Sequence, residues 1–258
     1  MMKWQQRKEE YSSTEYPFLY ETHLHTCQGS ACAKNTGAEM ARAAKEYGYT
    51  GIIVTEHNWG GNTCLDGNLS WEDWVDAYTA GYRAAKEEGR KIGLDVFFGM
   101  EAGFDGTEFL LYGLTPEWFK QHPEVKQAQI GELYEMVKGA GGLMIHAHPF
   151  REEPYIPQIR LFPEWVDGVE GMNATHSCSK STKHNDPAFD KRAIEYANKN
   201  RLPMTAGSDV HTTAMLGGGM AFRRRLKDME DFIRAVKTGE DYILTNGDNC
   251  YTRYGELL

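Results

Sequence analysis

The feature that most constrains the fold of this chain is a repeated alternation of short apolar runs with longer segments of helical character. Seven runs have the length of buried strands, and they span residues 18–20, 51–55, 96–98, 108–112, 143–145, 168–170 and 203–205. Strands that alternate with helices are typical of parallel sheets with crossover connections. The pattern therefore predicts an α/β fold, either a barrel or a doubly wound sheet.

The segments between the runs carry helix signals. Apolar residues recur at helical spacing through residues 40–47, and Gly48 follows as a C-cap. Ser70 is suited to cap the start of a helix from residue 71 to about residue 88. Further helices are predicted over residues 129–138, 187–198 and 227–237.

Histidines and acids stand at or just after the ends of the predicted strands. They are His23, His25, Glu56, His57, Glu101, His146, His148, Asp209 and His211. In a parallel barrel, all carboxyl ends of the strands open onto one face, so such residues converge there. A doubly wound sheet would gather only those near its switch point. The distribution therefore favours the barrel.

These side chains point to metal binding. Burying so many imidazoles and carboxylates without a cation costs several kcal/mol for each unpaired group, whereas divalent ions prefer these ligands. Alternate residues of a strand face one side, which lets His23 and His25 bind one ion. The same spacing relates Asp209 to His211. It also relates His146 to His148, where Pro149 ends the strand and one of the two can serve as a support only. The ligands exceed the needs of one ion.

Five short strings resemble, in order, the motifs of the PHP (polymerase and histidinol phosphatase) family. They are Glu21-Thr22-His23-Leu24-His25-Thr26, Thr55-Glu56-His57-Asn58, Gly99-Met100-Glu101, Ala147-His148-Pro149 and Gly207-Ser208-Asp209-Val210-His211. The second string has Glu where the family usually has Asp. The resemblance runs from about residue 18 to about residue 215. It implies a distorted (β/α)7 barrel of the PHP type, with residues 1–258 as a single domain that a C-terminal helix and strand at about 225–250 complete.

The resemblance also implies a site for two or three divalent metal ions, for which Mn, Zn and Fe all stay open. By that analogy, the first ion is held by His23, His25, Glu101 and Asp209. Glu101 bridges to a second ion, which His148 also binds. His57 and His211 hold a third.

Two positions depart from the family pattern. Many members carry a His on the strand after the third motif, where this chain has Glu108 in the string 108–113. A carboxylate there can bind a metal and favours a harder ion such as Mn²⁺, or it is a surface residue at the start of an edge strand. After the first motif, Cys32 is the only ligand-capable side chain in the string 28–33. It is a third-metal ligand, or else it is a buried free thiol, or no third ion binds.

Arg151 follows His148-Pro149-Phe150 and is expected on the loop above the barrel mouth. A guanidinium there can clamp a phosphate and stabilise charge during its transfer; the alternative is an ion pair with Glu152 or Glu153. His57, His211 or His146, where no metal occupies them, can protonate a leaving alkoxide. A polar loop, 173–186, carries His176 and His184 and suits contact with a substrate.

Charge and composition narrow the partners. The net charge of −9 argues against a nucleic-acid polymer. No apolar stretch is long enough for a membrane span, and Met1 to Glu10 lack the apolar core of a secretory signal. Five cysteines form no C-x-x-C pair, which favours a reducing, cytoplasmic setting.

We therefore expect a phosphoric ester hydrolase that uses a metal-activated water on a small phosphorylated substrate, a phosphomonoester such as histidinol phosphate or a nucleotide. Two alternatives stay open. One is a metal-stabilised binding module without catalysis. The other is an amidohydrolase-like C–N hydrolase, although such barrels usually carry a metal-bridging lysine and no lysine stands at a strand end here.

Overall fold

The structure is a computed structural model that describes residues 15–240 and 242–258. The prediction that Met1 to Glu10 carry no secretory signal falls outside these residues. Within them, no helix combines the length and the apolar character that a membrane crossing requires.

The chain has a mixed α/β fold built on one curled sheet, whose strand order is β10-β9-β8-β1-β2-β3-β4-β5-β6-β7. The seven predicted strands are all present and lie side by side in sequence order. They are β1 (Phe18–Leu24), β2 (Gly51–Val54), β3 (Asp95–Phe104), β4 (Thr107–Tyr112), β5 (Leu143–Ala147), β6 (Gly168–Asn173) and β7 (Met204–Gly207).

One of these strands does not run parallel to its neighbours, which corrects the prediction of parallel strands throughout. β4 is antiparallel to both β3 and β5. The connection from β3 to β4 is the dipeptide Asp105-Gly106, and both residues have positive φ, 47° and 81°. This is the geometry of a tight hairpin turn, and two residues are too few for a crossover.

Three further strands extend the sheet on the other side of β1, so the described sheet has ten strands rather than seven. β8 (Gly218–Phe222) pairs antiparallel with β1, and β9 (Tyr242–Asn246) and β10 (Cys250–Thr252) follow it. The C-terminal strand and helix expected at about 225–250 correspond to β9 and α9 (Met229–Thr238). β8 and β10 were not predicted from the sequence.

The predicted helices are found as α2 (Gly37–Tyr47), α6 (Ile130–Gly139), α8 (Pro187–Asn200) and α9, with Gly48 as the left-handed C-cap of α2. The helix predicted from residue 71 to about 88 is present, but it is divided into two helices at Thr79. Ser70 caps α3 (Trp71–Tyr78) as predicted. Thr79 ends α3, and α4 (Ala80–Ile92) begins at the next residue. The short helices α5 (Pro116–Gln121) and α7 (Ala174–Ser177) were not predicted.

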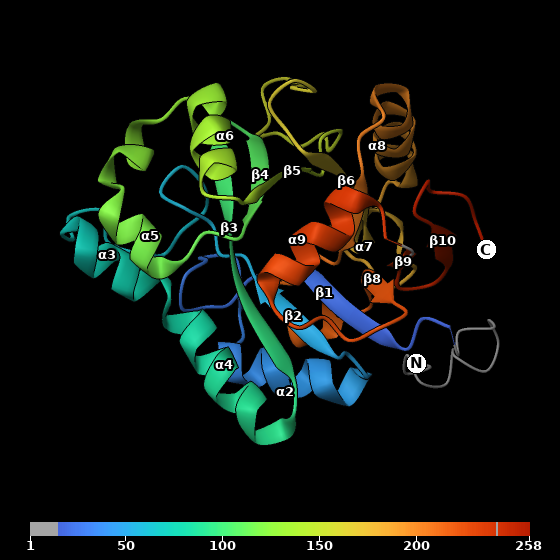
Figure 1. The fold of residues 1–258 in the computed structure, drawn as a ribbon, viewed down its shortest axis with the longest axis horizontal. Coiled ribbons are helices and arrows are strands. Elements are labelled where there is room, and N and C mark those ends of the chain that lie inside the picture. The colour runs from blue at the N-terminus through green and yellow to red at the C-terminus, as the bar shows by residue number, and fades with distance from the viewer. Residues whose placement is uncertain (1–14, 241) are drawn as a thin grey trace.

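The two faces of the sheet carry different cores. One face, here called the inner face, includes Tyr20, Ile53, Leu110 and Ile145. The opposite, outer face packs β1 and β2 against α2 and α4, and it packs β3 to β5 against α3, α5 and α6. Figure 1 shows α3, α5 and α6 grouped on one side of the molecule and α8 on the other. Polar residues at the strand ends of the inner face form the candidate site.

Candidate metal centre

The segment that follows β7 closes the curl of the sheet against β1. The Val210 N–H donates to the His23 carbonyl (3.1 Å), and the Val210 carbonyl accepts from the His25 N–H (2.9 Å). Asp209 and His211 flank Val210, so they lie beside His23 and His25. Two motifs almost two hundred residues apart in the sequence therefore meet through backbone pairing.

His23 and His25 reach the inner face because β1 is irregular. Tyr20 lies on that face, so strict alternation would point Leu24 inward and both histidines outward. The pairing of β1 with β2 shifts its register between Glu21 and Leu24, and Leu24 packs in the outer core beside α2. This bulge turns both imidazoles inward.

Glu101, at the inner face of β3, lies at the centre of the cluster. Its Oε1 is 3.2 Å from His23 Nε2 and 3.0 Å from His148 Nε2. Its Oε2 is 3.4 Å from His25 Nε2 and 2.8 Å from His57 Nδ1. Burial opposes the ionisation of Glu101, but the charges of His23 and His57 hold its pKa well below the usual range. An ionised carboxylate with two imidazoles at each oxygen can bridge two cations.

Several buried polar atoms at this point lack a hydrogen-bond partner within the described part of the chain. They are Nε2 of His23, Nε2 of His25, Nδ1 of His57 and Oε2 of Glu101. The last two atoms are only 2.8 Å apart. Each such atom costs about 1–3 kcal/mol when unsatisfied. The donor set fits divalent metal ions, which would satisfy all four atoms.

The ligand atoms form four overlapping groups, within each of which all atoms lie within 4.8 Å of one another. The groups are His23–His25–Glu101, His23–His148–Asp209, His57–Glu101–Glu108 and His25–His57–His211. Four residues each belong to two groups, so the groups describe adjacent sites with shared ligands. Asp209 Oδ1 lies 3.6 Å from His23 Nε2 and 3.3 Å from His25 Nε2, which brings together the four side chains predicted for the first ion.

Hydrogen bonds on the far side of three rings orient their Nε2 atoms toward the cluster. The Nδ1 partners are Glu170 Oε1 for His23 (2.9 Å), Ser30 Oγ for His25 (3.1 Å) and the Asp209 carbonyl for His211 (2.8 Å). Such outer contacts set the tautomer and the ring angle of metal-binding imidazoles. Glu170 and Ser30 were not among the predicted site residues. Glu170 had a signal, because it is an acid at the end of a predicted strand.

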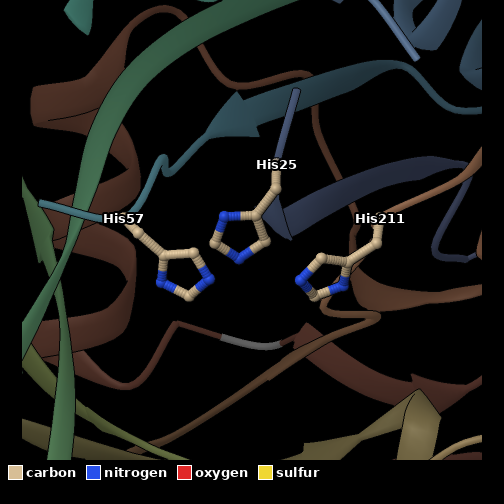
Figure 2. Close-up of side chains that lie close together, drawn as sticks. All are labelled: His25, His57 and His211. Carbon is tan, nitrogen blue, oxygen red and sulfur yellow. The ribbon is translucent and has the colours of Figure 1, made fainter. Parts of the chain in front are cut away.

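Three imidazoles from different strand ends lie side by side at the wall of the site (Figure 2). The ring centroid of His25 is 4.3 Å from that of His57 and 4.7 Å from that of His211. Cys32 lies against the same rings. Burial alone would raise the pKa of the Cys32 thiol, but hydrogen bonds with His211 and His57 lower it to about 6. The predicted third-metal residues are thus adjacent, and the thiol is readily ionised.

Glu108 is not a surface residue at an edge. β4 lies between β3 and β5, and Glu108 points to the inner face, 3.7 Å from His57 Nδ1 and 3.6 Å from His148 Nε2. Burial and the nearby Glu101 carboxylate raise the pKa of Glu108 to about 7. A cation at this position would stabilise the ionised form.

Arg151 is buried beside the cluster, and it pairs with neither Glu152 nor Glu153, the alternative partners considered from the sequence. Its Nη2 donates to Asp209 Oδ2 (2.7 Å) and to Thr175 Oγ1 (3.1 Å), and its Nε donates to His176 Nε2 (3.0 Å). Because a guanidinium only donates, His176 Nε2 accepts here, and its Nδ1–H donates a hydrogen bond to Asp190 Oδ1 (2.7 Å). The predicted polar loop thus contributes His176, which supports Arg151. Asp190, the hydrogen-bond partner of His176, comes from α8.

His146 is not brought to the cluster, which corrects its prediction as a proton donor. It pairs across the strands with Phe109 and stacks on that ring at 4.9 Å in the outer core. Burial lowers the pKa of His146 to about 3. His148, two residues on, would face the same way by alternation, but its φ of 27° turns it inward. Asp209 also has a positive φ, 52°, and such backbone strain is concentrated at functional sites.

Glu56 of the T-E-H string supports the site without facing it. It accepts hydrogen bonds from the Thr26 N–H (3.0 Å), from the Thr26 hydroxyl and from Ser30 Oγ (2.6 Å). Glu56 is longer than the Asp that is usual at this position of the motif, and Gly29 and Gly81 leave space for it. A Cβ at either glycine would lie 2.7 Å or less from Glu56 or Thr26.

A cavity of about 1010 Å³ opens onto the cluster. Its wall includes His57, Glu108, His148, Arg151 and Asp209. Most of the other lining residues come from the loop after α7, from residues 60–62 and from the segment after His211. The candidate ligands are therefore reachable by a small molecule.

Comparison with known proteins gives one family match and several similar folds. The family model described as PHP-associated matches residues 189–240. No curated protein matches the chain. A two-domain protein from Bacteroides vulgatus, containing a predicted PHP-like metal-dependent phosphoesterase, superposes with a TM-score of 0.65 at 15% identity over 91% of this chain. The chain spans 66% of the length of that protein.

Two other structures are similar at comparably low identity. A candidate metal-dependent phosphoesterase from Bifidobacterium adolescentis has a TM-score of 0.52 and 16% identity, over 84% of this chain and 94% of its own. An amidohydrolase from Chromobacterium violaceum, with bound sulfate and no metal, has a TM-score of 0.50 and 14% identity, over 75% of this chain and 87% of its own. At these identities the likeness establishes the fold. The matched PHP-associated segment agrees with the resemblance to the PHP family that the five motifs carry.

Proposed function

We propose that this chain is a metal-dependent phosphoesterase that hydrolyses a small phosphorylated substrate. The observation that carries the proposal is the convergence of four imidazoles on the two oxygens of Glu101, with unpartnered nitrogens and an open cavity beside them. The fold shared with PHP-like phosphoesterases supports the same reaction class.

The proposed ligands follow the grouping of the side chains. His23, His25, Glu101 and Asp209 would hold the first ion. Glu101, His148 and Glu108 would hold the second. His57, His211 and Cys32 would hold the third where one binds. When bound, such ions make water a nucleophile near neutral pH and neutralise charge on the phosphate oxygens.

Side chains of the protein would orient the substrate and protonate the leaving group. The Arg151 guanidinium, fixed by Asp209, Thr175 and His176, would hold a phosphate oxygen and stabilise the charge that develops on it. His57 or His211, where it is free of metal, would give its proton to the leaving alkoxide from the cavity wall. His146 has no part in this mechanism because it faces the outer core.

The test combines elemental analysis of the purified protein with hydrolysis of a panel of phosphomonoesters and phosphodiesters. We expect two or three equivalents of a divalent metal and an activity that chelation abolishes. Glu101→Ala should lose both, whereas Glu135→Ala, an exposed acid on α6, should lose neither. Metal-replete protein that is inactive on the whole panel would favour a silent binding module, and activity that survives Glu101→Ala would refute the mechanism.

A C–N hydrolase is the second candidate, because an amidohydrolase shares the fold. Among the described residues no lysine is buried, and Glu101 rather than a lysine lies between the ligand groups. An amide panel run beside the phosphate panel separates the two. Metal-dependent amide hydrolysis without phosphate release would replace the proposed function.

A further inference from the structure

The cavity at the metal centre concentrates positive charge in an acidic chain. The sequence has 37 Asp and Glu against 28 Lys and Arg, yet among the residues that the structure describes only two carboxylates, Glu108 and Asp209, line the cavity. Both are candidate metal ligands, so bound ions would neutralise them. The cations that line the cavity are Lys34, Arg151, Lys180 and Lys183.

Arg151 and the lysines differ in what they contact. Arg151 is buried and already bonded to Asp209. Lys34, Lys180 and Lys183 are exposed to the cavity and form no ion pair among the described residues. On the helices, by contrast, Lys91 pairs with Glu87 at 3.1 Å and Lys120 with Asp76 at 2.8 Å. Three ammonium groups are therefore free to bind an anion inside the cavity.

The three lysines come from two walls. The Lys34 N–H donates to the His211 carbonyl (2.9 Å), so Lys34 stands beside the metal cluster. Lys180 and Lys183 belong to the loop after α7, where Ser181 and Thr182 also line the cavity. Two ammonium groups and the Thr182 hydroxyl supply donors for a phosphate oxygen, while the Ser181 hydroxyl donates to the Lys183 carbonyl (2.7 Å) and holds the loop.

We propose that the substrate carries a second phosphate, which Lys180, Lys183 and Lys34 bind while the first is held at the metals for cleavage. This inference rests on the proposed function. The cavity of about 1010 Å³ is at the upper end of the range for small-molecule sites, about 300–1,000 Å³, and it far exceeds the volume of one phosphate group. The exposed lysines attract the distal group and discriminate against substrates without it.

The experiment compares α,ω-alkanediol bisphosphates with n-alkyl monophosphates of two to eight carbons. We expect kcat/KM to favour the bisphosphate by about tenfold at a preferred chain length, an effect in keeping with exposed charge pairs. Lys180→Ala/Lys183→Ala should bring this ratio close to one. Lys191→Ala/Lys199→Ala on α8 removes the same charge away from the cavity, and it should leave the ratio unchanged.

Binding provides a readout that does not need catalysis. Butane-1,4-bisphosphonate should bind the metal-loaded protein more tightly than butylphosphonate in calorimetry, and the Lys180→Ala/Lys183→Ala variant should lose the difference. Equal affinity for the two phosphonates, or a difference that survives this variant, would overturn the inference. Failure to hydrolyse any phosphate ester would instead refute the proposed function, while tighter bisphosphonate binding would still support the subsite.

Discussion

Two His-x-His pairs of identical spacing meet different environments in this protein. At the end of β1, both His23 and His25 face the metal cluster. At the end of β5, only His148 does, while His146 stacks on Phe109 in the outer core. The spacing does not distinguish the two pairs; the local difference is Pro149 after His148, which indicated that one of that pair is a support without saying which.

The difference lies in where the backbone departs from regular strand geometry. In β1, the register shift comes between Glu21 and Leu24, so it turns both histidines together. In β5, the strand stays regular through Ala147, and the left-handed φ comes at His148 itself. The second residue alone is turned. The His-x-His spacing predicts a pair of ligands. The position of the backbone irregularity determines whether one or both histidines face the cluster.

The largest expected effect comes from the same substitution made at both positions of the β5 pair. His148→Phe should lower metal content and reduce kcat/KM by about 10³-fold, because losing one ligand removes several kcal/mol of charge stabilisation. His146→Phe should keep both metal and activity, since this ring faces the core. Equal losses in the two variants, measured by elemental analysis and phosphate release, would break the comparison.

Glu170 ties the two pairs together, which permits a smaller and more selective test. One carboxylate oxygen accepts from His23 Nδ1 (2.9 Å) and the other from the His148 N–H (3.1 Å). Glu170→Gln keeps the shape but loses one acceptor, and such outer contacts are typically worth about 10–100-fold in metal affinity. Metal titration should show that loss, with Glu164→Gln, an exposed acid before β6, as the unaffected control.

The outward position of His146 predicts a pH effect on folding. Burial lowers its pKa to about 3, so between that value and the ordinary value near 6.5 the unfolded chain binds the extra proton. The metal-free protein should therefore lose stability as the pH falls below 6.5, by up to about 1.4 kcal/mol per pH unit from this group. His146→Phe lacks this loss. Urea unfolding at pH 7, 6 and 5 should show the two proteins diverging, and parallel curves would contradict the assignment.

At neutral pH the same variant should show the smallest effect. His146 Nδ1 has no hydrogen-bond partner in the described structure, and removing an unsatisfied buried polar atom recovers free energy. We expect His146→Phe to raise the free energy of unfolding by about 1 kcal/mol. His122→Phe is the control, because His122 is partly exposed and bonded to Glu124 (2.8 Å), and it should bring no gain. A clear destabilisation of His146→Phe would mean that the ring is held by its polar atoms.

Much of the fold was predictable because its signals are local. Each of the seven strands is a compact apolar run, and Gly48 and Ser70 end or begin helices through their own backbone and side-chain chemistry. The hairpin into β4 had a local signal as well, the Asp105-Gly106 dipeptide, which the strand–helix alternation obscured. The interruption at Thr79 was not predicted, because apolar residues at helical spacing continue across it, at Tyr78 and Tyr82.

For the candidate site, too, some features follow from local sequence and others from contacts between distant segments. The sequence alone determined which kinds of ligand are present, in what order and at which strand ends, because residue type and strand spacing are properties of short segments. Only the tertiary structure decided which side chains meet: a register shift in β1, positive φ at His148 and Asp209, and the pairing of Val210 with β1. These irregularities persist because packing from distant segments outweighs their local strain, and no short stretch of sequence contains that balance.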